Sequence, residues 1–192
     1  MMFSEEMIRK MLPKTYSRKH VAREVFIAIT HFDTLVPIVD KYVYSDGTAK
    51  NLMSLTGTLP VIYNDKTYNI PVCTWIEESY PQTAPICYVR PTREMLIVKG
   101  KYVSSNGEVE LPYLEEWNKR KCNLVTLLQV MVAMFGEFPP LCMRPFSELE
   151  QASCRHQYQR QTDVFSNADG SLYINILGED NRPFQQHNET NC

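Results

Sequence analysis

The spacing of apolar residues changes twice along this 192-residue chain, and this change limits the fold more than any other feature. Near the N-terminus and again over residues 124–135, apolar side chains recur every three or four residues, as on one face of an amphipathic helix. The middle of the chain is instead rich in β-prone runs separated by turn signals. Helices flanking a run of strands predict an α+β domain.

Two or three helices are expected. Ser4 is a plausible cap for a first helical stretch around residues 5–12, and Pro13 with the Tyr16-Ser17 stretch predicts either a kink or a break after it. A second helix ends before Pro37, and a third over 124–135 ends at Gly136 and the prolines that follow. The stripe of the second helix consists of Val21, Val25, Ile29 and Phe32.

Turn residues divide the middle of the chain into strands. Strands are predicted at 38–44, 52–63, 67–75 and 86–89. The Ser-Asp-Gly sequence at 45–47 and the Asn-Asp-Lys sequence at 64–66 predict hairpin turns, and Asn106-Gly107 predicts another tight turn.

The amino-acid composition of the chain changes after residue 145. Residues 146–192 are rich in Gln, Asn, His, Ser and Arg, with one short β-prone run at 172–177. So little apolar surface cannot offset the entropy of ordering. We therefore expect one domain over residues 1–145 and a disordered or loosely packed polar tail over 146–192.

Composition excludes several classes of protein. The 20 basic and 22 acidic residues are spread without blocks, which gives no electrostatic case for nucleic-acid binding. No stretch approaches the ~18–20 apolar residues that span a bilayer. The first 14 residues mix charges with apolar side chains, unlike a signal peptide. We expect a cytoplasmic protein without membrane insertion.

No catalytic, cofactor or metal motif stands out. Phosphate loops, GxSxG elbows and HExxH helices are absent, and no histidine lies near a candidate nucleophile at a strand end. The cysteines include no CxxC pair, so a zinc site has little support and reduced thiols are expected. The six are Cys73, Cys87, Cys122, Cys142, Cys154 and Cys192.

Aromatic residues near the predicted strand ends give the clearest positive signal. Tyr63 and Tyr68 flank a tight turn, Met95 follows a proline-rich loop, and Pro139 follows the last helix. Flat, amphipathic side chains suit polyproline II peptides. The alternative is that these tyrosines only pack the sheet edge.

Several runs together resemble the UEV (ubiquitin-conjugating enzyme variant) family, in its ESCRT-I branch. They are Leu-Thr-Gly-Thr-Leu-Pro-Val at 55–61, Thr-Tyr-Asn-Ile-Pro-Val-Cys at 67–73, Leu-Pro-Tyr-Leu at 111–114 and Glu-Trp at 116–117. The similarity runs from about residue 5 to residue 145. It implies the ubiquitin-conjugating-enzyme-like fold, an antiparallel β-meander flanked by N-terminal and C-terminal helices.

The same resemblance implies that the chain is not an enzyme. Active ubiquitin-conjugating enzymes carry a cysteine in a pattern like Asn-Gly-x-Ile-Cys-Leu, and here Glu110 stands at the cysteine position. A carboxylate cannot replace the thiolate nucleophile of ubiquitin transfer. The family's His-Pro-Asn reads Gly100-Lys101-Tyr102, so the asparagine expected to stabilise an oxyanion is also missing.

The resemblance implies two binding surfaces on this chain. The first binds Pro-Thr/Ser-Ala-Pro peptides, with Tyr63, Tyr68 and Met95 holding the second proline. At its lip the family's Val-Phe-Ser reads Leu-Cys-Met at 141–143, which predicts weaker or altered specificity. The predicted peptide-binding residues are Thr58, Tyr63, Tyr68, Asn69, Ile70, Thr92, Met95, Pro139, Leu141 and Met143.

The second surface is for ubiquitin. Trp75 is either an exposed anchor on a sheet face or a core residue, and the sequence leaves both open. The predicted ubiquitin-binding residues are Val43, Ser45, Asp46, Trp75 and Tyr88.

The resemblance therefore predicts an adaptor of endosomal sorting, recruited peripherally to endosomes, with ubiquitin, proline-containing peptides and other ESCRT-I subunits as partners. The alternative is a cofactor that pairs with an active ubiquitin-conjugating enzyme to direct chain formation. Residues 146–192 show no heptads and few prolines, so we expect this chain to lack assembly regions.

Overall fold

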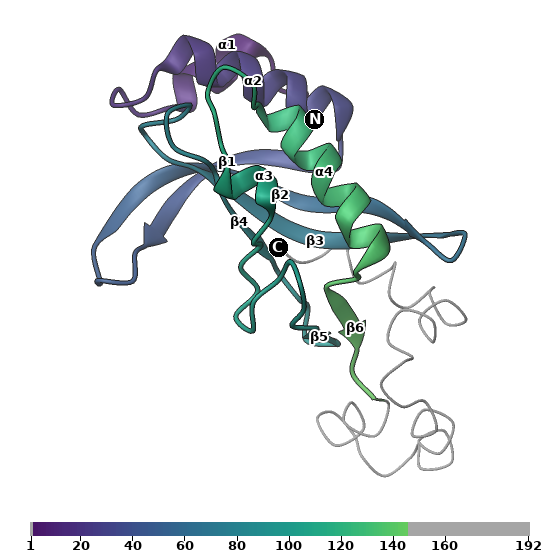
Figure 1. Cartoon of the computed structure of the whole chain (residues 1–192). Helices are drawn as coiled ribbons and strands as arrows, with labels where there is room; N and C mark the ends of the chain where they lie inside the picture. Colours follow the sequence, from purple (N-terminus) through teal and green to yellow (C-terminus); the bar gives the residue numbers. More distant parts are fainter. Residues whose placement is uncertain (1, 146–192) are drawn as a thin grey trace.

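The computed structural model describes residues 2–145 and has three layers of helix, sheet and loop (Figure 1). Two helices, α1 (Glu5–Met11) and α2 (Arg18–His31), come first. Four strands follow: β1 (Leu35–Val43), β2 (Ala49–Tyr63), β3 (Lys66–Ile76) and β4 (Ile86–Val89). The chain continues through β5 (Met95–Ile97), α3 (Pro112–Glu115), α4 (Leu124–Glu137) and β6 (Leu141–Met143).

Local sequence signals account for the helix starts. Ser4 caps α1 by accepting a hydrogen bond from the Met7 N–H, and Asn123 caps α4 in the same way through Thr126. Helix α4 runs past Gly136 to Glu137, so the expected stop at the glycine is wrong by one residue. A side chain at Gly136 would place its Cβ 2.8 Å from the Ile62 carbonyl oxygen, so the glycine lets the helix approach β2 closely.

Strands β1 to β4 form one antiparallel sheet in sequence order. The predicted turn between β2 and β3 is tight, because Asn64 and Asp65 both adopt the positive φ values of a type I′ hairpin. Gly57 in β2 has φ +150°, and a Cβ there would lie 2.1 Å from the Thr34 carbonyl oxygen. Only glycine fits at this close contact, which holds the residues at the start of β1 against β2.

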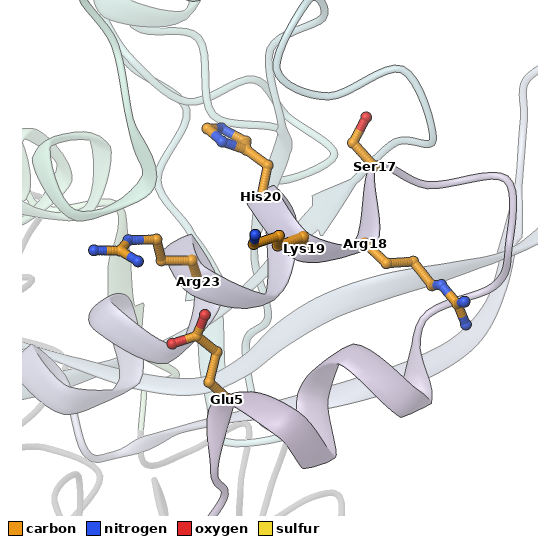
Figure 2. A pocket seen from close by; sticks show the side chains of 6 residues that line it. All are labelled: Glu5, Ser17, Arg18, Lys19, His20 and Arg23. Atoms are coloured by element: carbon orange, nitrogen blue, oxygen red, sulfur yellow. The ribbon is translucent and has the colours of Figure 1, made fainter.

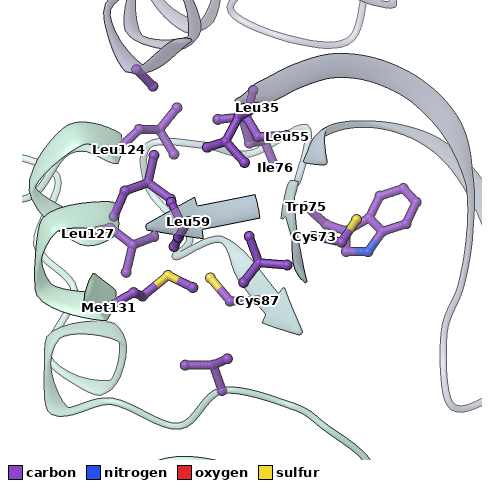
Figure 3. Close-up of a cluster of buried hydrophobic side chains, with 14 of the residues drawn as sticks. Leu35, Leu55, Leu59, Cys73, Trp75, Ile76, Cys87, Leu124, Leu127 and Met131 are labelled. Carbon is purple, nitrogen blue, oxygen red and sulfur yellow. The ribbon is translucent and has the colours of Figure 1, made fainter. Parts of the chain in front are cut away.

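The hydrophobic core lies between the sheet and α2 and α4. Figure 3 shows Leu124, Leu127 and Met131 of α4 pointing toward Leu59 of β2, while Trp75 lies on the opposite face of the sheet. Period-two alternation produces this division, because neighbouring residues of a strand face opposite sides.

Three elements were not predicted: the short strands β5 and β6, which pair antiparallel, and the four-residue helix α3. The model has a mixed α+β architecture, as expected. Within residues 2–145, the longest helices have 14 residues, and none is long and apolar enough to cross a bilayer. The predicted tail, 146–192, lies outside the described residues.

Candidate ligand-binding surfaces

The predicted peptide-binding residues come from two places that the fold brings near the C-terminal end of α4. Tyr63 and Tyr68 flank the β2–β3 turn, and they are close enough that the Tyr63 hydroxyl contributes to a raised pKa of Tyr68, after the larger effect of burial. Met95 and Met143 are directly opposite one another in the β5–β6 ladder. The α4 end contacts β2 at Gly136, three residues before Pro139. We call the ten predicted residues the peptide surface.

The peptide surface is uneven in exposure. Tyr63, Asn69, Pro139 and Met143 are half-buried. Tyr68 and Met95 are only 1% and 2% exposed, so they lie beneath the surface rather than on it. The remaining residues, Thr58, Ile70, Thr92 and Leu141, are buried as well.

Sheet alternation also splits the peptide surface. Tyr63, Tyr68 and Ile70 share the face that packs toward α4, whereas Thr58 and Asn69 lie on the opposite face. The Thr92 hydroxyl donates to a Glu94 carboxylate oxygen at 3.0 Å, so it can accept a hydrogen bond from a ligand, but it can donate one only after it rotates. The structure therefore does not gather all ten residues on one face.

The predicted ubiquitin-binding residues Val43, Ser45 and Asp46 lie at the tip of the β1–β2 hairpin. Val43 is 58% exposed. Asp46 accepts hydrogen bonds from the Thr48 backbone N–H at 2.9 Å and from its hydroxyl at 2.7 Å. These bonds lower the pKa of Asp46, and they fix the turn that presents Val43.

The exposed-anchor alternative for Trp75 is wrong, because this side chain is only 7% exposed. Its ring packs edge-on against Tyr42 at 5.1 Å, and Tyr42 in turn packs against Tyr44 at 4.9 Å. The Tyr42 and Tyr88 hydroxyl oxygens are 3.4 Å apart. Partly buried tyrosines thus surround Trp75 and supply the accessible aromatic edge.

Sequence reasoning missed Tyr42 and Tyr44 as candidate ligand contacts, and it missed two exposed residues of the neighbouring strand, Val36 and Ile38. Tyr42, Val36 and Ile38 all lie on the Trp75 face of the sheet. A signal existed, since residues 36, 38 and 42 follow the period of two that places β-strand side chains on one face.

Glu110 is exposed and follows a turn closed by Gly107. Its backbone N–H donates to the Tyr102 carbonyl oxygen at 2.7 Å, so residues 100–102 lie beside it. Next to Tyr102, the Lys101 ammonium lies 5.4 Å and 5.5 Å from the ring centres of Tyr102 and Phe138.

Four cysteines lie in the described part of the chain, and none of them forms a disulfide. Cys73, Cys87 and Cys142 are buried. Burial raises the pKa of Cys73 and raises that of Cys87 to about 12, so these two thiols stay protonated at neutral pH. Cys154 and Cys192 lie outside the described residues. Between residues 2 and 145, no group of three or more His, Cys, Asp and Glu side chains is placed to hold a metal ion.

Comparison with known proteins connects these surfaces to a family. Over 147 residues, the chain is 46% identical to the human tumor susceptibility gene 101 protein, covering 77% of this chain and 38% of that protein. The chain thus spans less than two-fifths of the length of this relative.

Two solved structures of Vps23 UEV domains share the fold at 24% identity, each covering 71% of this chain. One, from yeast, is in complex with a Vps27 PSDP peptide, with a TM-score of 0.61 over 92% of that chain. The other is in complex with ubiquitin, with a TM-score of 0.55 over 94% of that chain. The fold is therefore that of UEV domains, which is the ubiquitin-conjugating-enzyme-like fold predicted from the sequence.

A model of the UEV domain family matches residues 7–143, which include the four-stranded sheet and the helices α2 and α4 that pack on one face of it. This chain therefore belongs to the UEV domain family.

Proposed function

We propose that this chain is a non-catalytic adaptor module of endosomal sorting that binds short proline-containing peptides and ubiquitin. The observation that carries the proposal is the placement of Tyr63 and Tyr68 across a tight turn, beside the α4 end that leads to Pro139. Aromatic faces next to one another can receive the rings of a polyproline II peptide. The yeast Vps23 UEV domain, which shares the fold, was solved with a PSDP peptide.

The exposure of the peptide surface shapes the expected affinity. Tyr63, Pro139 and Met143 have accessible area, whereas Tyr68 and Met95 offer little. A peptide would contact the first three directly, and Tyr68 and Met95 would support these contacts from beneath the surface. Met95 and Met143 can adapt to different side chains, because methionine is unbranched and polarizable. We expect a weak site that tolerates variation between its prolines.

The hairpin tip and the tyrosines around Trp75 would form the ubiquitin-binding surface. Val43 supplies exposed apolar area, and Tyr42 and Tyr88 offer aromatic edges with hydroxyl groups. Such residues suit a protein interface, where one side of the ring packs and the hydroxyl stays hydrated. The other Vps23 structure, with ubiquitin, supports this part of the proposal.

Loss of the nucleophile supports binding without catalysis. Glu110 stands where the resemblance places the transferring cysteine, and the buried Cys87 thiol is protonated at neutral pH. We expect the protein to act in the cytoplasm, recruited peripherally to endosomes with other ESCRT-I subunits, as the resemblance to that branch of the family implies.

Fluorescence anisotropy with a labelled Pro-Thr-Ala-Pro peptide tests the proposal. Tyr63→Ala is expected to weaken peptide binding about tenfold, which corresponds to about 1.4 kcal/mol. Ubiquitin binding, measured in parallel, should be unchanged, because the hairpin tip lies at the other end of β2.

Ile62→Ala is the matched control. Ile62 is the neighbour of Tyr63 in β2, it is 64% exposed, and it points to the opposite face of the sheet. Equal peptide affinity of wild type and Tyr63→Ala, or a larger loss in Ile62→Ala, would contradict the proposed surface.

A further inference from the structure

A surface depression of about 460 Å³ lies between the start of α1 and the first turns of α2, away from both surfaces described above (Figure 2). A volume of this size is in the range of small-molecule sites. Its lining is almost entirely basic or polar, with one acidic residue. The lining residues are Glu5, Ser17, Arg18, Lys19, His20 and Arg23.

The positive charge around this depression is not neutralised by the fold. Among the described residues, Arg18, Lys19 and Arg23 take part in no ion pair, whereas His20 is paired with Glu24 at 2.7 Å. The first turn of α2 holds no acidic residue to offset its helix dipole. Glu5, from α1, supplies one negative charge, and Glu24 beside His20 supplies a second, against three cations.

A second basic segment, residues 119–121 (Lys-Arg-Lys), is brought beside the first, although nearly a hundred residues separate them. Glu24 of α2 accepts a hydrogen bond from the Leu124 N–H at 3.2 Å, at the start of α4. On the same side, the Tyr80 ring lies 6.3 Å from His20 and 5.7 Å from Trp117. Figure 1 shows the loop before α4 rising next to α2.

The basic segment is also exposed and unpaired. Lys119, Arg120 and Lys121 are all exposed, and within residues 2–145 none of them is in an ion pair. We call these three residues, together with Arg18, Lys19 and Arg23, the basic face. It gathers six of the 20 cationic side chains of a chain whose net charge is −2.

Exposed apolar side chains lie next to the basic face. Met2 is 83% exposed and precedes Glu5 by three residues, which places it within about 10 Å of the depression. Ile27 is 39% exposed and follows Arg23 by one helical turn, on the same side of α2. Cations beside accessible apolar residues are typical of proteins that bind at the interface of a bilayer.

We propose that the basic face binds the phosphorylated headgroups of an anionic bilayer, with one headgroup in the depression. Phosphate groups would meet Arg18, Lys19 and Arg23, and the loop at 119–121 would lie against neighbouring headgroups. Single-stranded nucleic acid fits less well, since it needs open aromatic platforms. The nearest indole, Trp117, is half-buried and donates its N–H to the Pro81 carbonyl oxygen at 2.8 Å. This inference goes beyond the proposed function and does not depend on it.

Vesicle co-sedimentation of the full 192-residue chain tests the proposal. Phosphatidylcholine vesicles, with or without phosphatidylserine and a phosphoinositide, are the probes. Binding is expected with the anionic lipids alone. Each cation near an anionic surface contributes about 1 kcal/mol, so the triple variant R18E/K19E/R23E should bind at least 100-fold more weakly.

The triple variant K41E/K66E/K99E is the matched control, because it reverses three exposed lysines outside the basic face and changes the net charge equally. It should bind vesicles more tightly than R18E/K19E/R23E by a factor of at least ten. Circular dichroism confirms folding, and Pro-Thr-Ala-Pro binding by R18E/K19E/R23E separates this test from that of the proposed function.

Three results would overturn the proposal. The first is equal loss of vesicle binding in both triple variants, which would indicate an effect of net charge alone. The second is full retention of binding by R18E/K19E/R23E. The third is binding of free inositol phosphate or of RNA without any binding of anionic vesicles, which would assign the face to a different ligand.

Discussion

The phenol of Tyr16 joins the α1–α2 connection to two strands of the sheet, and its removal gives a sharp test of the fold. The Tyr16 hydroxyl donates to the Ile76 carbonyl oxygen and accepts from the Met53 N–H at 2.9 Å. Met53 and Ile76 are opposite one another in the β2–β3 ladder, and both are 0% exposed. The hydroxyl thus satisfies two backbone groups that water does not reach.

Tyr16→Phe keeps the ring and removes this bridge. A buried polar group left without a partner costs about 1–3 kcal/mol, so two such groups should lower the free energy of unfolding by roughly 2–6 kcal/mol. With a urea m-value of about 2 kcal/mol per M, the midpoint of unfolding should fall by about 1–3 M.

Urea unfolding followed by circular dichroism measures this effect. Tyr88→Phe is the control. Among residues 2–145, the Tyr88 hydroxyl has only the 3.4 Å contact with the Tyr42 hydroxyl, so a loss below about 0.5 kcal/mol is expected. If Tyr16→Phe were as stable as the control, the bridge would not stabilise the fold, and the reasoning from buried backbone groups would fail.

Three further predictions follow from the fold and the lost nucleophile. Gly57→Ala should destabilise the domain by more than about 3 kcal/mol or prevent soluble expression, because its Cβ would overlap the Thr34 carbonyl; native solubility and stability of this variant would contradict the close approach. The free energy of unfolding should fall as pH rises from about 9 to about 12. Burial raises the pKa values of Cys87 and Tyr16 to about 12 in the folded state, so both groups keep their protons there. In the unfolded chain the thiol loses its proton from about pH 9 and the phenol from about pH 10, so high pH favours unfolding. Cys87→Ala should reduce the fall between about pH 9 and pH 10 without abolishing it, because burial also raises the pKa of Cys73; an unchanged fall in urea unfolding would contradict the assignment. Incubation with activating enzyme, ubiquitin and ATP should give no reductant-sensitive ubiquitin adduct, and addition of this chain to an active conjugating enzyme should not stimulate ubiquitin-chain synthesis. An adduct would indicate conjugating activity, and a stable heterodimer that stimulates synthesis would indicate a cofactor of a conjugating enzyme.

Much of the fold follows from the sequence. The helical spacing of apolar residues located α1, α2 and α4, and turn residues separated β1 to β4 within a few residues of their observed ends. Strands β5 and β6 were missed because three residues are too short to show a period. Helix α3 was missed for the same reason, since it has four residues and begins at a proline.

The candidate sites depend less on spacing and more on tertiary contacts. Trp75 illustrates this, because its position in a β-strand does not reveal that Tyr42 covers it. The basic face is a second example. Charges that are spread evenly along the chain become a cluster when Glu24 contacts the start of α4 and brings residues 119–121 beside α2. The ten residues of the peptide surface came from family resemblance, and their roles stay predictions.

An NMR titration of isotope-labelled protein with a Pro-Thr-Ala-Pro peptide tests most directly whether this chain is a peptide-binding adaptor. The account predicts chemical-shift changes concentrated at Tyr63, Asn69, Pro139-flanking residues and Met143, saturating at millimolar peptide or below, with the hairpin tip around Val43 unaffected. Unchanged shifts at these positions in the presence of millimolar peptide, or changes confined to other faces of the domain, would contradict it.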